Sequence, residues 1–265
     1  MSNLWLGRGA QYDLYGGNTG QGTNVSKTSF TQIASSTTRA YESLIVSVGD
    51  NSMPAAGQSF DLGVGASGSE QILCPTIYFP QVDPTAGDHS TLSVQLPLAI
   101  PSGTRVAIRN NGGGEPFAGL IGVSGVPLSE KGFRFAEAMG FSTNIGTVVS
   151  PSATGGTYGS WTEITSSTEH NYAAIMACLG GNDLNIYGEP FQFDIGYGAS
   201  GSQQPLVAGL QGDAGESTGI LSQNYYGPFA CDIPAGTALW ARTVSVTSSP
   251  PTIVGFDLVL YGFVR

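Results

Sequence analysis

Charge is scarce in this sequence of 265 residues, because only 11% of them are Asp, Glu, Lys or Arg. There are 9 basic residues, of which Lys27 and Lys131 are the only lysines, and the net charge is −10 at pH 7. Proteins hold a nucleic-acid backbone or an anionic membrane mainly through clustered lysine and arginine. The composition therefore argues against direct binding of nucleic acid or of a membrane.

Long apolar runs are absent too, and none approaches the roughly 20 residues of a membrane span. The first residues lack the basic and apolar blocks of a secretory signal, so we expect synthesis in a cytoplasm. The three cysteines, Cys74, Cys178 and Cys231, match neither a zinc-ribbon spacing nor a CxxC pair. We expect no disulfide, no metal and no cofactor.

Glycine, in contrast, is abundant at 39 residues, and Ser, Thr, Asn and Gln fill most remaining polar positions. Glycine loses backbone entropy in a helix, and short polar side chains compete with the helical hydrogen bonds. Short strands joined by Gly- and Pro-marked turns use this composition well. The sequence therefore predicts an all-β fold.

An internal repeat organises the chain. Residues 60–71 (FDLGVGASGSEQ) return as 193–204 (FDIGYGASGSQQ), and 100–109 (IPSGTRVAIR) return as 233–242 (IPAGTALWAR), both 133 residues later. Upstream, 30–41 (FTQIASSTTRAY) matches 161–172 (WTEITSSTEHNY) at an offset of 131. Colinear matches at nearly one spacing indicate a duplicated unit of domain size.

The predicted architecture is two tandem β-sandwich, jelly-roll-like domains that arose by internal duplication. We place an extended N-terminal arm at 1–21, the first sandwich at 22–126 and the second at 146–265. A linker at 127–145 joins them, with a possible short helix at 128–139. The repeat also aligns Cys74 with Val207 and Cys231 with Leu98, which suggests that the cysteines are small core residues.

Sequence patterns typical of catalytic sites are weak in this chain. The segments 63–68 and 196–201 fit G-x-G-x-x-G, but neither opens a helix as dinucleotide binding requires. The histidines, His89 and His170, accompany no nucleophile motif. Asp61 and Asp194 could form a glycosidase pair, although their duplication favours a role in the fold. We predict no catalytic residues and no enzyme, with a glycan hydrolase as a remote alternative.

Aromatic residues give the better candidates for partner contact. Trp5, Tyr12 and Tyr15 lie in the predicted arm, which could extend along a neighbouring subunit or dock on its own domain. Tyr225 and Tyr226 could form a contact or sugar-stacking surface, or could simply pack within a hairpin.

Three motifs of the first unit carry a resemblance: S-S-T-x-x-x-Y, then D-x-G-x-G-A-S-G-S-E, then I-P-x-G-T-R-x-A-x-R, between Ser35 and Arg109. In this order they resemble virion structural proteins of tailed bacteriophages, which are small β-sandwich proteins of the capsid surface or tail. The second unit departs at Ala238 and Gln203, the counterparts of Arg105 and Glu70. Any partner contact made by Arg105 would therefore belong to the first unit alone.

The resemblance implies a decoration or cement protein on the outer surface of a phage head. Its partners would be the major capsid protein or other virion proteins, and further copies of itself in a homo-oligomer. The alternative is a tail or fibre component that binds host glycans. Position on the particle, oligomeric state and strand topology are left open by the sequence.

Overall fold

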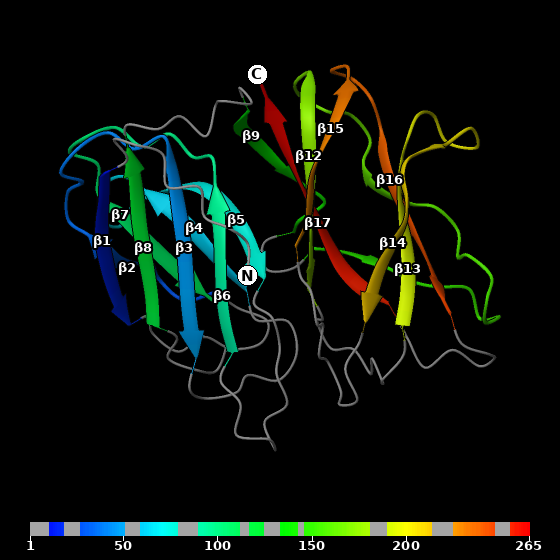
Figure 1. Cartoon of the computed structure of the whole chain (residues 1–265), viewed down its shortest axis with the longest axis horizontal. Helices are drawn as coiled ribbons and strands as arrows, with labels where there is room; N and C mark the ends of the chain where they lie inside the picture. The colour runs from blue at the N-terminus through cyan, green and yellow to red at the C-terminus, as the bar shows by residue number, and fades with distance from the viewer. Residues whose placement is uncertain are drawn as a thin grey trace.

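The computed structural model describes residues 11–18, 27–50, 59–78, 90–111, 117–124, 133–142, 146–180, 190–213, 225–246 and 255–265. Within these ranges every helix or strand element is a strand, and they number seventeen (Figure 1). No helix among the described residues is long and apolar enough to cross a membrane. The all-β prediction is confirmed.

The first half of the chain forms two four-stranded antiparallel sheets. One sheet has the order β1 (Gln11–Asn18), β8 (Phe117–Ser124), β3 (Ser43–Asp50), β6 (Ser90–Leu96). The other has the order β2 (Thr31–Ala34), β7 (Val106–Asn110), β4 (Ser59–Val64), β5 (Gln71–Tyr78).

The second half forms two further sheets. The sheet that we call the central sheet has the order β10 (Thr147–Val149), β17 (Phe256–Val264), β12 (Tyr172–Gly180), β15 (Tyr225–Ile233), with β9 (Arg134–Met139) also paired to β17. The outer sheet has the order β11 (Thr162–Thr165), β16 (Leu239–Ser245), β13 (Pro190–Tyr197), β14 (Gln204–Asp213).

The two halves share one strand order. Adding nine to each strand number of β1-β8-β3-β6 and β2-β7-β4-β5 gives β10-β17-β12-β15 and β11-β16-β13-β14. In each half eight strands pass between two antiparallel sheets in the manner of a jelly roll. Common descent of the halves by duplication stays a prediction, because strand order alone does not establish it.

The repeated motifs meet in space at one turn of each sandwich. Thr37, from the S-S-T motif, donates its hydroxyl to the carbonyl of Pro101 at 2.7 Å and accepts the amide of Thr104 at 3.0 Å. Thr168 makes the same pair of bonds in the second sandwich, at 2.9 and 3.1 Å. Gly103 has a φ of 79°, a conformation that favours glycine. These bonds give a physical reason for finding both motifs in both units.

The central sheet is buried on both faces. Along β12, Met176 and Cys178 belong to the core of the first sandwich, while Ile175 and Ala177 belong to that of the second. Figure 1 shows this sheet between the other sheets of the two halves. Tyr261 on β17 donates its hydroxyl across the boundary to the carbonyl of Thr76 at 2.9 Å. The structure therefore has two apolar cores, one on each face of the central sheet, and the first of them contains side chains from both sandwiches.

The described part of the predicted N-terminal arm is a strand, β1. Gln11–Asn18 pairs with β8 residue by residue, from Gln11 opposite Ser124 to Asn18 opposite Phe117. Pairing satisfies backbone donors and acceptors along β8 that would otherwise form a sheet edge. The rest of the predicted arm, 1–10 and 19–21, lies outside the described residues.

The predicted helix at 128–139 is wrong where the structure describes it, because Arg134–Met139 is strand β9. This strand pairs with β17, and Phe135 packs edge-on against Tyr261 and Phe263, with ring centroids 5.9 and 6.1 Å away. The pairing and burial available beside β17 outweigh the helix propensity of this short segment.

Candidate functional site

Asp61, one of the two acids that the repeat preserves, is a buried structural carboxylate. It is 1% exposed on β4 and forms an ion pair with Lys27, whose side chain is 2% exposed. It also accepts the Arg109 Nε–H at 2.8 Å and the amide of Thr76 at 2.8 Å. Burial lowers the pKa of Lys27, and the negative charge of Asp61 opposes that shift.

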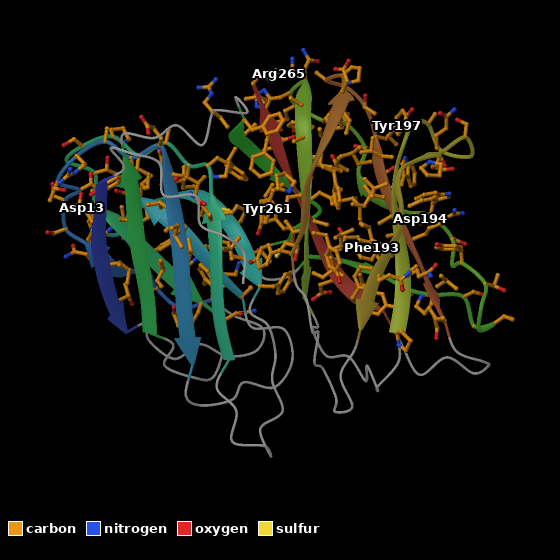
Figure 2. All side chains as sticks on the ribbon, viewed as in Figure 1. Asp13, Phe193, Asp194, Tyr197, Tyr261 and Arg265 are labelled. Atoms are coloured by element: carbon orange, nitrogen blue, oxygen red, sulfur yellow. The ribbon has the colours of Figure 1, made fainter. Side chains whose placement is uncertain are left out.

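Asp194 on β13 repeats this arrangement in the second sandwich (Figure 2). It accepts the Arg242 Nε–H and the amide of Gly209, each at 2.8 Å, and the hydroxyl of Tyr158 at 3.1 Å. Tyr158 thus stands where the first sandwich has Lys27. The acids lie in different sheets, each neutralised by its own arginine, so they do not form the exposed carboxyl pair that glycoside hydrolysis needs.

Arg105 uses its donors within the chain. Its Nη1 donates to the carbonyl of Gly65 at 3.1 Å and to Glu70 Oε1 at 2.8 Å, and its Nε donates to Gln32 at 3.0 Å. The other carboxylate oxygen of Glu70 accepts the amide of Gly68 at 3.0 Å. Arg105 therefore holds the glycine-rich loop after β4 in place through hydrogen bonds. Its contact with a partner stays a prediction.

The second sandwich fastens the equivalent loop without an arginine. Trp240 donates its indole N–H to the carbonyl of Gly198 at 2.8 Å, and Gly198 corresponds to Gly65 in the repeat. Ala238, at the position of Arg105, keeps only the backbone contact to Gly198 at 3.1 Å. The departure at Ala238 is thus compensated by another side chain.

The Tyr225–Tyr226 pair is internal. Tyr225 donates its hydroxyl to the carbonyl of Tyr78 at 3.0 Å, across the boundary between the sandwiches. Tyr226 is 6% exposed and packs edge-on against Phe193, with centroids 5.0 Å apart. Tyr225 is half-buried and Tyr226 is buried, so both pack within the chain; contact of this pair with a partner or a sugar stays a prediction.

The N-terminal aromatic candidates separate into two groups. Tyr12 and Tyr15 lie on β1, opposite Val123 and Leu120 of β8. Their side chains, and the whole of Trp5, lie outside the described residues. Partner contact by these three residues stays a prediction.

The repeat alignment predicted core positions for Cys74 and Cys231; the prediction is confirmed for Cys74, whereas Cys231 is only partly buried. Cys74 and Cys178 are fully buried in the core that the two sandwiches share, and Cys231 is partly exposed. Burial raises the pKa of the Cys178 thiol to about 11. Such thiols are poor nucleophiles at neutral pH, because the thiolate is the reactive form.

A polar cluster on the first sandwich, which we call the first shoulder, consists of Asp13, Thr38, Arg39 and Tyr41. Asp13 Oδ2 accepts the hydroxyls of Tyr41 at 2.6 Å and Thr38 at 2.8 Å, and it pairs with Arg39 Nε at 2.8 Å. The hydrogen bond from Tyr41 is the largest of the contributions that lower the pKa of Asp13. This shoulder is internally neutral and hydrogen-bonded.

The matching cluster on the second sandwich, the second shoulder, consists of Glu137, Glu169, His170 and Tyr172. A ligand atom from each of Glu137, Glu169 and His170 lies within 4.8 Å of the others. Glu137 Oε1 accepts the amide of Glu169 at 3.2 Å, and partial burial raises the pKa of Glu137. This cluster was not predicted from the sequence.

The alignment of the two repeats does distinguish the second shoulder from the first. The aligned motifs replace Thr38-Arg39 with Glu169-His170, which exchanges a cation for an acid and an imidazole. Glu137 gave no comparable signal, since its segment was predicted to be a linker helix.

No protein-family model matches this sequence, and no curated protein matches it. Among solved structures the chain is similar to the crystal structure of the STIV MCP, with 9% identity, a TM-score of 0.36 and coverage of 95% of this chain and 96% of that chain. It is also similar to the cryo-EM structure of Broad Bean Stain Virus, with 13% identity, a TM-score of 0.34 and coverage of 96% and 88%.

A third similar structure is the CBM22-1-CBM22-2 tandem domain from Paenibacillus barcinonensis Xyn10C, with 9% identity, a TM-score of 0.25 and coverage of 97% and 92%. Likenesses at this level do not identify a function.

Proposed function

We propose that this chain is a non-enzymatic structural protein of a virus particle, and specifically a decoration protein on the outer surface of a bacteriophage head. The observation that carries the proposal is the fusion of two jelly rolls through one shared core. Jelly rolls occur in viral capsid and lectin domains. A rigid block with two similar units presents two similar surfaces to a repetitive lattice, where weak contacts add through effective concentration.

The distribution of charge supports an exterior position. Five of the 9 basic residues pair with carboxylates of the chain itself: Lys27, Arg39, Arg105, Arg109 and Arg242. Few cations are left to neutralise phosphates, and the net charge is −10. Such a surface suits the side of a shell that faces away from packaged nucleic acid.

The chemistry of the described acids disfavours the hydrolase alternative. Asp61 and Asp194 are 1% and 2% exposed and are held by arginines in separate sheets. A lectin-like tail role is less favoured as well, since Tyr225 and Tyr226 are internal. The tail alternative then needs a glycan surface elsewhere on the chain.

Binding to shells tests the proposal. The purified chain is mixed with phage heads that lack it, and bound copies are counted by quantitative gel densitometry and cryo-electron microscopy. Coverage in a fixed ratio to the major capsid protein supports decoration. A few copies at one vertex would assign the chain to the tail, and the absence of binding to either structure would overturn the proposal.

Single substitutions can locate the contact surface in the same assay. We expect Trp5→Ala, Tyr12→Ala or Tyr15→Ala to weaken binding if the N-terminal segment contacts a neighbour. Tyr225→Phe is the matched control, because it removes only an internal hydroxyl. A glycan array run on the same preparation tests the receptor alternative.

A further inference from the structure

The two shoulders occupy equivalent positions in the two sandwiches. Asp13 lies opposite Gly122 of β8, and Glu137 lies opposite Gly262 of β17. A Cβ placed on Gly122 would lie 2.6 Å from the ring of Tyr41, and one on Gly262 would lie 2.4 Å from the ring of Tyr172. In each sandwich a tyrosine ring therefore lies over a glycine whose pairing partner on the next strand is an acidic residue.

The charges at these equivalent positions differ. In the first shoulder Arg39 supplies a positive group 2.8 Å from the Asp13 carboxylate. In the second shoulder the same place in the motif holds His170, and Glu169 adds a second carboxylate. Among the described residues no Lys or Arg forms an ion pair with Glu137 or Glu169. Two acids and an imidazole thus converge without an internal cation.

The tyrosine hydroxyls also differ. Tyr41 donates to Asp13 at 2.6 Å, whereas the buried hydroxyl of Tyr172 has no hydrogen-bond partner among the described residues. Tyr172 is 1% exposed, and its ring lies 6.5 Å from that of His170 at an edge-on angle. A buried polar group is normally hydrogen-bonded, and an unpaired one points to an additional ligand. The ring of Tyr172 lies over Gly262, whose pairing partner on β9 is Glu137.

We propose that the second shoulder binds one divalent transition-metal ion of the zinc class, with Glu137, Glu169 and His170 as its protein ligands. Imidazole nitrogen and carboxylate oxygen are both zinc ligands, whereas calcium and magnesium prefer oxygen alone. Water fills the fourth position, and the Tyr172 hydroxyl donates to that water or to a ligating carboxylate. The ion supplies the positive charge that Arg39 supplies in the first shoulder.

The geometry permits closure around such an ion. Zinc binds nitrogen and oxygen at about 2.0–2.2 Å, so ligand atoms in a tetrahedral site lie roughly 3.4 Å apart. The three donor atoms already lie within 4.8 Å of one another. Glu169 and His170 are exposed, and rotation of their side chains alone can shorten the remaining distance.

Calorimetric titration of the full chain with zinc chloride, under reducing conditions, tests the site. We expect one zinc ion per chain, and a loss of affinity of at least about a hundredfold in His170→Ala and Glu137→Gln. Removing an outer-shell hydrogen bond costs about 10–100-fold in affinity, so we expect Tyr172→Phe to bind about tenfold more weakly. Circular dichroism of each variant verifies folding.

Three controls make the result decisive. Arg39→Ala alters the first shoulder and should leave zinc affinity unchanged, and Cys231→Ser excludes thiol binding. The double substitution Thr38→Glu with Arg39→His should create a second site and raise the stoichiometry to two. No zinc binding, or binding that His170→Ala and Glu137→Gln leave intact, would overturn the proposal.

Discussion

At the scale of single residues, Asp61 and Asp194 occupy the same place in their sandwiches with different partners. Asp61 faces two cations, Lys27 and Arg109, and the lysine is almost completely buried. Asp194 faces one cation, Arg242, whose guanidinium also stacks on an aromatic ring with its central carbon 4.4 Å from the Trp161 centroid. Removal of the Asp61 carboxylate therefore leaves two cations without their anion, one of them buried, whereas removal of the Asp194 carboxylate leaves one.

We expect Asp61→Asn to destabilise the chain by about 3–5 kcal/mol, the range found when one partner of a buried ion pair is removed. Asp194→Asn should cost less, about 1–3 kcal/mol, because Arg242 is partly exposed and keeps its ring contact. Urea unfolding monitored by tryptophan fluorescence measures both. Equal costs would contradict the assignment of Lys27 as a buried charge that depends on Asp61.

The two glycine-rich loops offer a second comparison between residues. Arg105→Ala should loosen the loop after β4, since it removes the bonds to Gly65 and Glu70. Faster amide hydrogen exchange at residues 65–70, with little change at 198–203, is the expected result. Trp240→Phe should produce the reverse pattern, because the indole donor to Gly198 is lost. If neither variant changes the exchange rate of its own loop relative to the parent, these side chains do not hold the loops in place.

At the scale of elements, the contact between β5 and β12 joins the sandwiches. A Cβ added to Gly180 at the end of β12 would lie 2.2 Å from the ring of Tyr78 on β5. Gly180→Ala should therefore destabilise the chain by about 1–3 kcal/mol through overpacking. Gly236→Ala is a control on a turn, where nothing lies within 4 Å and only the positive φ of 83° opposes substitution. Thermal unfolding should show the larger loss for Gly180→Ala.

The elements also show which parts of the fold could be predicted from sequence. The abundance of glycine and of short polar residues predicted the all-β fold, because helix propensity and turn conformation are local properties. The strand β9 was not predicted, since its pairing depends on the distant strand β17. The second shoulder was not predicted for the same reason, because only the pairing of β9 with β17 brings Glu137 close to His170.

At the scale of the whole molecule, the buried carboxyl of Asp257 lies at the junction of the halves. It is the second residue of β17 in the second sandwich, and it accepts the hydroxyl of Tyr78 from the first at 3.3 Å. Its other oxygen has no partner among the described residues. Burial raises the pKa of Asp257 from 3.8 to about 7, and the Tyr78 hydrogen bond opposes that shift. The junction therefore favours a protonated carboxyl.

The sign of the resulting pH dependence follows from linkage. Between about pH 4 and pH 7 the unfolded chain releases the Asp257 proton while the folded chain retains it, so stability falls as the pH rises. A shift of about three pKa units corresponds to at most about 4 kcal/mol, with no further loss above pH 7. Asp13 and Glu70, whose pKa values are lowered, act in the opposite direction at more acidic pH.

Asp257→Asn should remove this dependence, because the amide does not ionise and fills nearly the same volume. We expect the variant to be more stable than the parent at pH 8 and to show a flatter profile of melting temperature between pH 5 and pH 8. Tyr78→Phe is the complementary variant: it deletes the hydrogen bond that stabilises the carboxylate, so the parent slope should persist or steepen. Parallel profiles for Asp257→Asn and the parent would mean that Asp257 does not govern the pH response of the shared core.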